Sequence, residues 1–405
     1  MNTFFIDGAR NYGYSGLIEE ICREPYYYPL YRTSDIYACW KNLLKALVSG
    51  RPITLLDSDV NPSEMADVDI ALLDKRVEIG SRAIETIGQL TDIVKKSESG
   101  ITLFTSGTTG RPKKIVHTVA SLTRTVRTGE KYRDNIWGFA YNPTHIAGLQ
   151  VFFQAFENAC TLINLFGKNR TEIYGIIRCN RITHLSATPT FYRLLLPAEE
   201  SFPSVERATL GGERSDGTLY ESIRKMFPNA RINNIYASTE AGSLFFTDDD
   251  RFRIPESIRD RIKVSDNELL IHRSLLGTSE SLSLDGEYYH SGDIIEWADE
   301  ERGTFRFVSR KNEMINVGGY KVNPEEVENA LLSIPGIRQA LVYGRSSSVL
   351  GNVICADIVS DDDCRMDAIG IKKELQGVLQ DFKIPRRIKF VETLPLTRTG
   401  KLKRS

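Results

Sequence analysis

Short apolar runs alternate with helix-patterned segments through most of the chain, and this alternation is the strongest constraint on its fold. Residues 36–48 carry apolar side chains at helical spacing and are followed, after Gly50, by the apolar run 53–56. The same alternation recurs further on, with strand-like runs at 161–165, 182–186 and 232–236 and a helical pattern at 219–227. Strands that alternate with helices favour a layered α/β body.

The last part of the chain has a different pattern. Asn323 supplies an N-cap, Pro324 a first-turn proline, and Glu326 stands where a capping box places glutamate. The segments that follow are strand-like at 339–343, 353–359 and 387–391 and helical at 371–379. We predict a separate small α+β domain of roughly 90 residues, because 405 residues are too many for one hydrophobic core.

Composition excludes several classes of protein. A net charge of −1 argues against a general nucleic-acid binder, and 41% hydrophobic and 26% charged residues are typical of a globular protein. No apolar run approaches the roughly 20 residues of a membrane span, and the first residues lack a signal-peptide pattern. Six cysteines without a C-x-x-C pair predict neither a disulfide framework nor a zinc site. We therefore expect a cytoplasmic protein that binds neither nucleic acid nor membrane.

The loop from Thr105 to Lys114 combines two glycines, four hydroxyls and three basic side chains after the apolar run 101–104. Backbone N–H groups near glycine, rotating hydroxyls and mobile positive charge suit phosphate binding. The loop is not a Walker A motif, because Pro112 occupies the position of the second glycine. A plain surface turn has the same composition. The candidate phosphate-binding residues are Thr105, Ser106, Gly107, Thr108, Thr109, Gly110 and Lys113.

Five further segments accompany this loop, at 234–240, 289–293, 309–312, 318–328 and 395–401. Together with it they resemble the adenylate-forming superfamily of acyl-CoA synthetases, nonribosomal-peptide adenylation domains and luciferases. The resemblance covers most of the chain. It implies a large layered N-terminal domain over residues 1–311, abbreviated at its start, and a small mobile C-terminal domain over residues 312–405.

The resemblance implies roles for residues around a nucleotide. Tyr236 packs against adenine, while Thr239 and Glu240 approach the phosphates and Mg²⁺. A carboxylate is a hard oxygen ligand that suits Mg²⁺, although a glutamate after a strand is also a common surface residue. Asp293 accepts hydrogen bonds from both ribose hydroxyls, which a carboxylate can do, and Arg310 lies near the ribose.

The same resemblance places three residues in the catalytic cycle. Asn312 is the hinge, where the family usually has Asp or Lys, and Gly319 lies in the loop that lines the pantetheine tunnel. Lys401 stands at the position of the catalytic lysine. By itself, the basic segment 381–405 would instead be interpreted as a solvated or nucleic-acid-binding tail.

The acid-binding pocket is expected around His145. Residues 143–149 resemble the pocket segment of aryl-CoA and o-succinylbenzoyl-CoA ligases, in which a histidine gates the carboxylate site, although a lone histidine is often a packed or surface residue. No Asp is placed to bind an α-amino group, which favours an aryl or acyl carboxylic acid. The other expected pocket walls are Gly211, Gly212, Glu213, Ala241, Gly242 and Ser243.

The implied reaction has two steps. ATP and Mg²⁺ activate the carboxylate to acyl-AMP with release of pyrophosphate, with Lys401 and Glu240 offsetting charge, and the acyl group then passes to the thiol of coenzyme A. Two alternatives stay open: transfer to the phosphopantetheine of a separate acyl carrier protein, and a catalytically silent protein that binds a nucleotide or a partner.

Overall fold

The computed structural model describes residues 3–58, 68–73, 75–80, 82–105, 113–213, 215, 217–311, 313–317, 320–347, 351–361 and 367–396. In this described part, the largest sheet has eight strands in the order β14-β13-β12-β11-β9-β10-β1-β2. Strands β1 and β9 to β13 run parallel to their neighbours, and the two edge strands are antiparallel. The bounds of this first sheet are β1 (Thr3–Asp7), β2 (Arg10–Gly13), β9 (Ile136–Phe139), β10 (Thr161–Asn164), β11 (His184–Ala187), β12 (Arg207–Gly211), β13 (Arg231–Ser238) and β14 (Gly242–Thr247).

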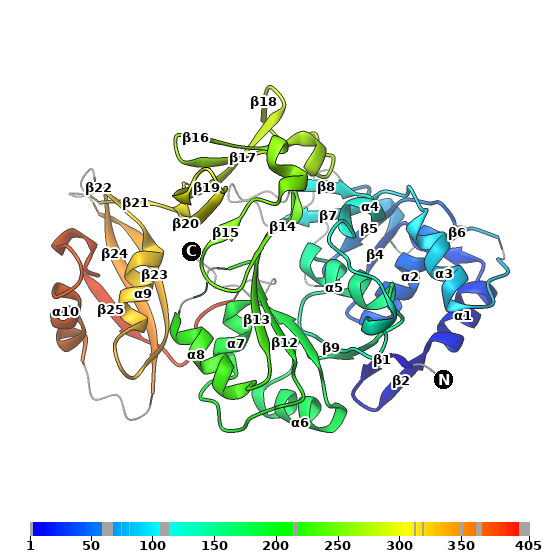
Figure 1. The fold of residues 1–405 in the computed structure, drawn as a ribbon, viewed down its shortest axis with the longest axis horizontal. Helices are drawn as coiled ribbons and strands as arrows, with labels where there is room; N and C mark the ends of the chain where they lie inside the picture. Colours follow the sequence, from blue (N-terminus) through cyan, green and yellow to red (C-terminus); the bar gives the residue numbers. More distant parts are fainter. Residues whose placement is uncertain are drawn as a thin grey trace.

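Helices pack against this sheet, as expected for α/β units (Figure 1). Their apolar faces form a core under β10 to β13 that includes Ile177, Leu185, Tyr192 and Phe227. The carboxyl ends of the parallel strands stay uncovered, which is where ligands bind in open α/β sheets. The helices of this part are α5 (Ile146–Phe156), α6 (Arg170–Asn180), α7 (Pro189–Leu194) and α8 (Gly217–Met226).

A second sheet lies beside the first, with strand order β4-β5-β7-β8. Helix α2 lies between the two sheets and is buried on nearly all sides, which explains its almost continuous apolar sequence. Its Trp40 packs on Phe139 and Phe152, with ring centroids 4.8 and 5.0 Å away. The bounds here are α1 (Tyr14–Arg23), β3 (Tyr26–Tyr27), β4 (Leu30–Arg32), α2 (Ile36–Val48), β5 (Ile53–Leu56), β6 (Val77–Glu78), α3 (Ile87–Lys95), β7 (Ile101–Thr105), β8 (Lys113–His117) and α4 (Val119–Leu122).

A third, antiparallel sheet follows, at the top of Figure 1. It has its own apolar core around Phe245, Leu269 and Phe305. Its two long strands, β19 and β20, pair so that Asp293 lies opposite Arg310. Its strands are β15 (Phe252–Arg253), β16 (Ile262–Ser265), β17 (Glu268–His272), β18 (Leu284–Asp285), β19 (Tyr288–Asp299) and β20 (Thr304–Arg310).

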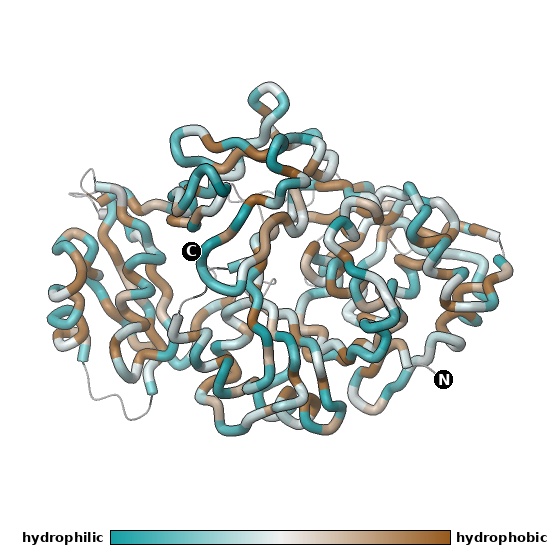
Figure 2. Tube along the Cα trace, in the orientation of Figure 1, coloured by the Kyte–Doolittle hydropathy of each residue, from teal (hydrophilic) through white to brown (hydrophobic). Residues whose placement is uncertain are grey.

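The small domain lies apart from the rest, at the left of Figure 1, and packs two helices on a sheet. As predicted, Asn323 caps α9, since its side chain accepts a hydrogen bond from Glu325 N at 3.1 Å. Figure 2 shows the hydrophobic residues concentrated along the strands of both domains. The elements are β21 (Ile315–Val317), β22 (Tyr320–Val322), α9 (Pro324–Leu332), β23 (Ile337–Ser347), β24 (Gly351–Ser360), α10 (Ala368–Gln376) and β25 (Arg387–Phe390).

This architecture confirms the prediction of a large α/β domain with a small α+β domain. The domain boundary before Asn312 stays a prediction, because that residue lies outside the described ranges. Within those ranges, no helix combines the length and apolar character needed to cross a membrane.

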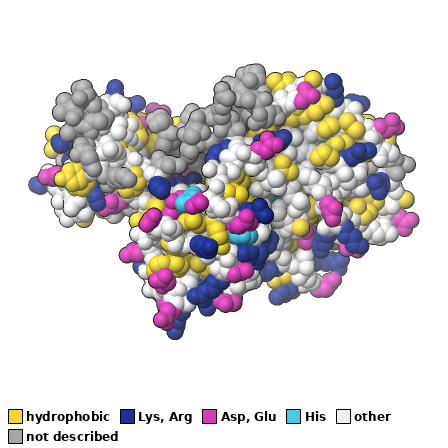
Figure 3. Space-filling view, turned by 90° about the horizontal axis from the view of Figure 1, so that it is seen from above, with side chains coloured by type: hydrophobic (Ala, Val, Ile, Leu, Met, Phe, Trp, Pro, Cys, Tyr) yellow, Lys and Arg dark blue, Asp and Glu magenta, His cyan; other side chains and the backbone are white. Residues whose placement is uncertain are grey.

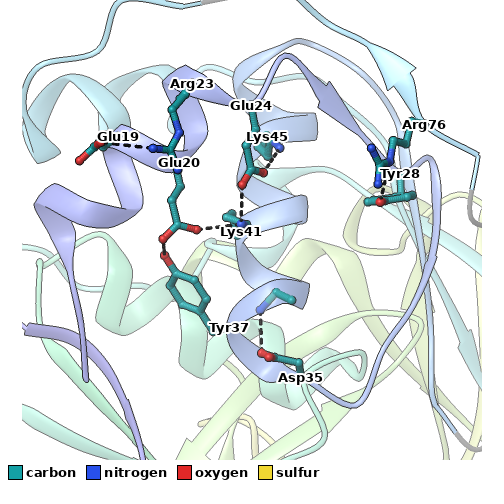
Figure 4. Close-up of polar contacts among 11 residues, drawn as sticks. Glu19, Glu20, Arg23, Glu24, Tyr28, Asp35, Tyr37, Lys41, Lys45 and Arg76 are labelled. Atoms are coloured by element: carbon teal, nitrogen blue, oxygen red, sulfur yellow. Dashed lines mark hydrogen bonds and ion pairs between the residues drawn. The ribbon is translucent and has the colours of Figure 1, made fainter. Parts of the chain in front are cut away.

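Ion pairs fasten helix α1 to helix α2 near the start of the described chain (Figure 4). Lys41 Nζ lies 2.7 Å from a Glu20 oxygen and 3.0 Å from Glu24 Oε1, and Lys45 Nζ lies 2.6 Å from Glu24 Oε2. Tyr37 also donates its hydroxyl to Glu20, at 3.1 Å. Burial alone would raise the pKa of Glu24, but the hydrogen bonds from Lys45 and Lys41 outweigh burial and hold it below its ordinary value.

We expect Glu24→Ala to lower the free energy of unfolding by about 1.5–3 kcal/mol, because the buried Lys45 ammonium loses a charge-assisted hydrogen bond. A depressed carboxyl pKa stabilises the fold above its unfolded value, 4.5, and this contribution is lost as the pH falls through the folded value. Urea denaturation followed by tryptophan fluorescence, at several pH values, measures both effects. Glu19→Ala, on the exposed side of the same helix, is the control; equal losses in the two variants would contradict the prediction.

Candidate functional site

A cleft of about 1690 Å³ opens at the carboxyl ends of β12 and β13. It is bounded by the third sheet and by α9 of the small domain. Residues from all three sheets line it, including Lys113 of the second, Tyr236 of the first and Asp293 of the third. The cleft therefore collects residues that the sequence predicted separately.

Asp293 is the centre of the polar side of this cleft. Its carboxylate is nearly buried, with 6% of the side chain exposed, and accepts from Arg310 Nε at 2.6 Å on Oδ1 and from the Tyr236 hydroxyl at 2.6 Å on Oδ2. Gly292, at φ 77°, turns the chain directly before it. Burial and then Asp293 raise the pKa of Tyr236, and Asp293 raises that of Arg310, so both remain donors. The aspartate is thus held in one orientation by two donors.

Tyr236 also belongs to an aromatic wall. Its ring stacks on Phe307 with 4.5 Å between ring centroids and on Phe245 with 5.4 Å. Tyr236 and Phe307 line the cleft next to Asp293.

Glu240 lies just beyond β13, and its neighbours come from three segments. The carbonyl of Thr239 lies 2.7 Å from His117 Nε2, and the carbonyl of Glu240 accepts from Gly277 N at 2.7 Å. The Tyr289 hydroxyl lies near the Glu240 carboxylate; burial and then the charge of Glu240 raise the pKa of Tyr289 to about 12. Burial lowers the pKa of His117, which keeps its ring neutral with Nε2–H as a donor to the carbonyl. The backbone that carries Glu240 is therefore fixed from both sides.

His145 stands at the N-cap of α5 and lines the cleft. Its Nε2 lies 3.6 Å from Asp57 Oδ2, and the buried Asp57 also accepts from Asn142 Nδ2 at 2.7 Å. Beside it, Ser243 donates to Gln150 Oε1 at 2.8 Å. This end of the cleft is polar but not strongly charged.

The other expected pocket walls divide into two groups. Gly211, Gly212 and Glu213 line the cleft, and Glu213 accepts a hydrogen bond from Thr190 N at 2.9 Å. Ala241 instead packs in the apolar core of the third sheet, and neither it nor Gly242 is among the described residues that line the cleft. Gly242 takes a positive φ of 68° at the start of β14.

The candidate phosphate loop connects two strands that end at this cleft. Thr105, the last residue of β7, pairs with Lys113, the first of β8. Lys113 lines the cleft, while Lys114, where the family commonly has glycine, is exposed. Eight predicted site residues lie outside the described ranges: Ser106, Gly107, Thr108, Thr109, Gly110, Asn312, Gly319 and Lys401.

In the described part of the chain, no three His, Cys, Asp or Glu residues are grouped to hold a metal ion. A Mg²⁺ ion usually binds one or two carboxylates together with substrate phosphates, so Glu240 alone fits this role. Sequence reasoning assigned no role to His117, Asp57 or Tyr289. Two sequence signals could have indicated these residues. Tyr289 begins the segment 289–293 that contains Asp293, and Asp57 directly follows the buried strand β5.

Comparison with known families decides the relationship. Residues 44–267 match the AMP-binding enzyme model, and residues 326–401 match the model of the AMP-binding enzyme C-terminal domain. The chain belongs to the AMP-binding enzyme family. The expected membership of the adenylate-forming superfamily is thereby confirmed, and the family's enzymes are ligases.

Individual relatives have low sequence identity to this chain, but the matches cover most of its length. 2-Succinylbenzoate–CoA ligase of Staphylococcus aureus is 27% identical, over 91% of this chain and 86% of the relative. Bacitracin synthase 3 of Bacillus licheniformis is 26% identical over 88% of this chain, which spans 6% of that protein. ATP-bound MatB from Rhodopseudomonas palustris has the same fold, with a TM-score of 0.76, 18% identity and coverage of 99% of this chain and 94% of MatB. o-Succinylbenzoate CoA synthetase (MenE) from Bacillus subtilis, in complex with the acyl-adenylate intermediate OSB-AMP, also has this fold. Its TM-score is 0.71 and its sequence identity 19%, and the match covers 99% of this chain and 94% of MenE.

Gly277, whose N–H donates to the Glu240 carbonyl, lies where a side chain has no room. A Cβ at this glycine would lie 2.7 Å from Ile115 Cγ2, 2.8 Å from His117 Cε1 and 2.9 Å from Val116 O. We expect Gly277→Ala to lower the free energy of unfolding by about 1–3 kcal/mol. Thermal unfolding measures this, with Gly175→Ala as the control, since no atom lies within 4 Å of that added Cβ. A Gly277→Ala protein as stable as the control would contradict the expectation.

Proposed function

We propose that this protein activates a carboxylic acid with ATP, forming an acyl-adenylate and releasing pyrophosphate, and then transfers the acyl group to the thiol of coenzyme A. One observation carries the proposal: Asp293 with its two donors, Glu240, His145 and Lys113 all line a single cleft. Family membership supports ATP as the nucleotide, and MatB in the matching structure is bound to ATP.

The nucleotide would lie along the polar side of the cleft. Each Asp293 oxygen accepts one hydrogen bond from the protein and retains lone pairs for a ribose hydroxyl. Tyr236 and Phe307 supply the aromatic wall for adenine, and Thr239 and the loop from Thr105 to Lys113 bind the phosphates. Because Arg310 and Tyr236 already orient Asp293, ribose binding requires little rearrangement of this carboxylate.

Glu240 is the residue that would hold Mg²⁺ between the protein and the phosphates. The ion, when bound, neutralises charge on the phosphoryl oxygens. The protein's own contribution is to fix the backbone that carries Glu240, through His117 on the Thr239 carbonyl and Gly277 on the Glu240 carbonyl.

The acid would enter beside His145. We propose that His145, oriented by Asp57, contacts the substrate carboxylate and directs it toward the α-phosphorus for in-line attack. Lys401 then offsets charge on the attacking and phosphoryl oxygens. For the second step, the small domain would turn about Asn312 and replace Lys401 with the loop at Gly319.

The substrate is proposed to be an aryl or acyl carboxylic acid. The likeness to 2-succinylbenzoate–CoA ligase supports an aryl acid. Among the described residues of the cleft wall at Gly211, Gly212, Glu213 and Ser243, no Asp is placed to bind an α-amino group. The likeness to bacitracin synthase 3 favours the second candidate acceptor, the phosphopantetheine of a separate carrier protein.

The first step is tested by carboxylate-dependent ATP–pyrophosphate exchange across a panel of aryl and acyl acids. We expect Lys401→Ala to slow exchange by about 10²–10³-fold, the usual loss for one preorganised donor. Lys403→Ala, two residues further along the same basic segment, is the matched control. An unchanged exchange rate in Lys401→Ala would contradict the assignment of Lys401 as the catalytic lysine. Absence of exchange with every acid would instead favour a silent nucleotide-binding protein.

The acceptor is tested separately. The acyl-adenylate formed from the best acid is offered coenzyme A or a phosphopantetheinylated carrier protein, and thioester is measured by mass spectrometry. We expect coenzyme A to be acylated at the higher rate. Thioester on the carrier alone would replace this assignment with the second candidate.

A further inference from the structure

Glu268, the first residue of β17, carries a buried carboxylate on the side of the third sheet next to Asp293. Only 5% of its side chain is exposed, and its oxygens accept three hydrogen bonds. Gly292 N donates to Oε1 at 3.0 Å, while His290 Nδ1 and Lys311 Nζ each lie 3.1 Å from Oε2. None of the roles proposed above uses this carboxylate.

The donors belong to the two strands that form the nucleotide site. Gly292 directly precedes Asp293 in β19, and Lys311 directly follows Arg310 at the end of β20. Lys311 N also donates to the Gly292 carbonyl at 2.8 Å. Glu268 thus links Gly292, which precedes Asp293, to Lys311, which follows Arg310.

The charge state of Glu268 makes this junction strong. Burial would raise the pKa of its carboxyl, but hydrogen bonds from His290, Lys311 and Gly292 lower it below the ordinary value. The ionised carboxylate depends on these donors, because an uncompensated charge in a buried position is unfavourable. Figure 3, in which the third sheet faces the viewer, shows acidic, basic and histidine side chains close together over this sheet.

Lys311 is also the last described residue before Asn312. Its side chain is 62% exposed, yet its ammonium is turned back onto Glu268. A rotation of the small domain beginning at Asn312 would act directly on Lys311, and through it on the strand end that carries Arg310.

We propose that Glu268 is a positioning residue that locks Lys311, on the large-domain side of the predicted hinge, to the Gly292–Asp293 segment of β19. The lock keeps Lys311, Gly292 and therefore Asp293 fixed while the small domain turns between the two half-reactions. This inference rests on the proposed function for its consequence, but the lock itself is a property of the fold.

The lock is tested first without any substrate, by hydrogen–deuterium exchange of the amides of Gly292 and Lys311. In Glu268→Gln we expect both amides to exchange about tenfold faster, the size of one lost charge-assisted hydrogen bond. Lys263→Met, on neighbouring β16, removes a cation of the same sheet that packs on Tyr288, and should leave both amides unchanged. Unchanged exchange in Glu268→Gln overturns the proposal, whatever reaction the protein performs.

The consequence is tested with Lys311→Met, which leaves the Gly292 bond to Glu268 intact. We expect adenylation, measured by pyrophosphate exchange, to stay within about twofold, and single-turnover transfer from preformed acyl-adenylate to the thiol to slow about tenfold. Lys311→Arg should restore transfer, since it retains the cation. Equal slowing of both steps indicates a merely structural role and overturns the proposal. Failure of wild-type protein to adenylate any acid contradicts the proposed function instead and leaves the hydrogen-exchange result standing.

Discussion

The Asp293 carboxylate and its two donors hold the ligand-facing side of this protein together. Arg310 reaches it from the neighbouring strand of the third sheet, and Tyr236 reaches it from the end of the first sheet, 57 residues earlier. A nearly buried charge must be compensated by hydrogen bonds, so this group couples the two sheets at the edge of the cleft. An apolar contact accompanies it, because Tyr236 and Phe245 of the first sheet pack on Phe307 and Phe305 of the third.

The second sheet joins the same region by a neutral contact. His117, at the end of β8, holds the Thr239 carbonyl 122 residues away, and the bridge between Val116 and Thr278 brings the third sheet to the same strand. Burial keeps the imidazole uncharged, so this contact does not add a positive charge beside Glu240. Each of the three sheets therefore supplies backbone or side-chain support at the point where phosphates and a metal ion are proposed to bind.

Local signals in the sequence predicted much of this structure. The helix at 36–48 has the bounds expected, because Asp35 caps its start and Gly50 follows its end. The run predicted as strand at 182–186 instead begins at His184, because Thr183 uses its hydroxyl to bind the backbone of Ile136 before the ladder starts. Asp293 and Arg310, which lie in recognisable segments, were predicted as site residues, and the fold pairs them at the cleft while their roles stay predictions. His117 and Asp57 were not, since their partners lie 122 and 85 or more residues away and only the tertiary fold brings them together. Ala241 was expected at the pocket surface and packs in the core, because a short motif does not specify which side of a strand end faces a cavity.

The placement of helix α2 has a consequence for cooperativity. One continuous apolar core contains Phe4 and Phe139 of the first sheet, Trp40 of the helix, and Ile53 and Leu103 of the second sheet. These two sheets cannot lose their packing independently, so they form one folding unit. The small domain has a separate core, built in the described part of the chain from residues between Ile315 and Ile388. On heating or in denaturant, the small domain should therefore unfold separately from the large domain. The boundary between these two unfolding units is the same place about which the proposed reaction requires the small domain to turn.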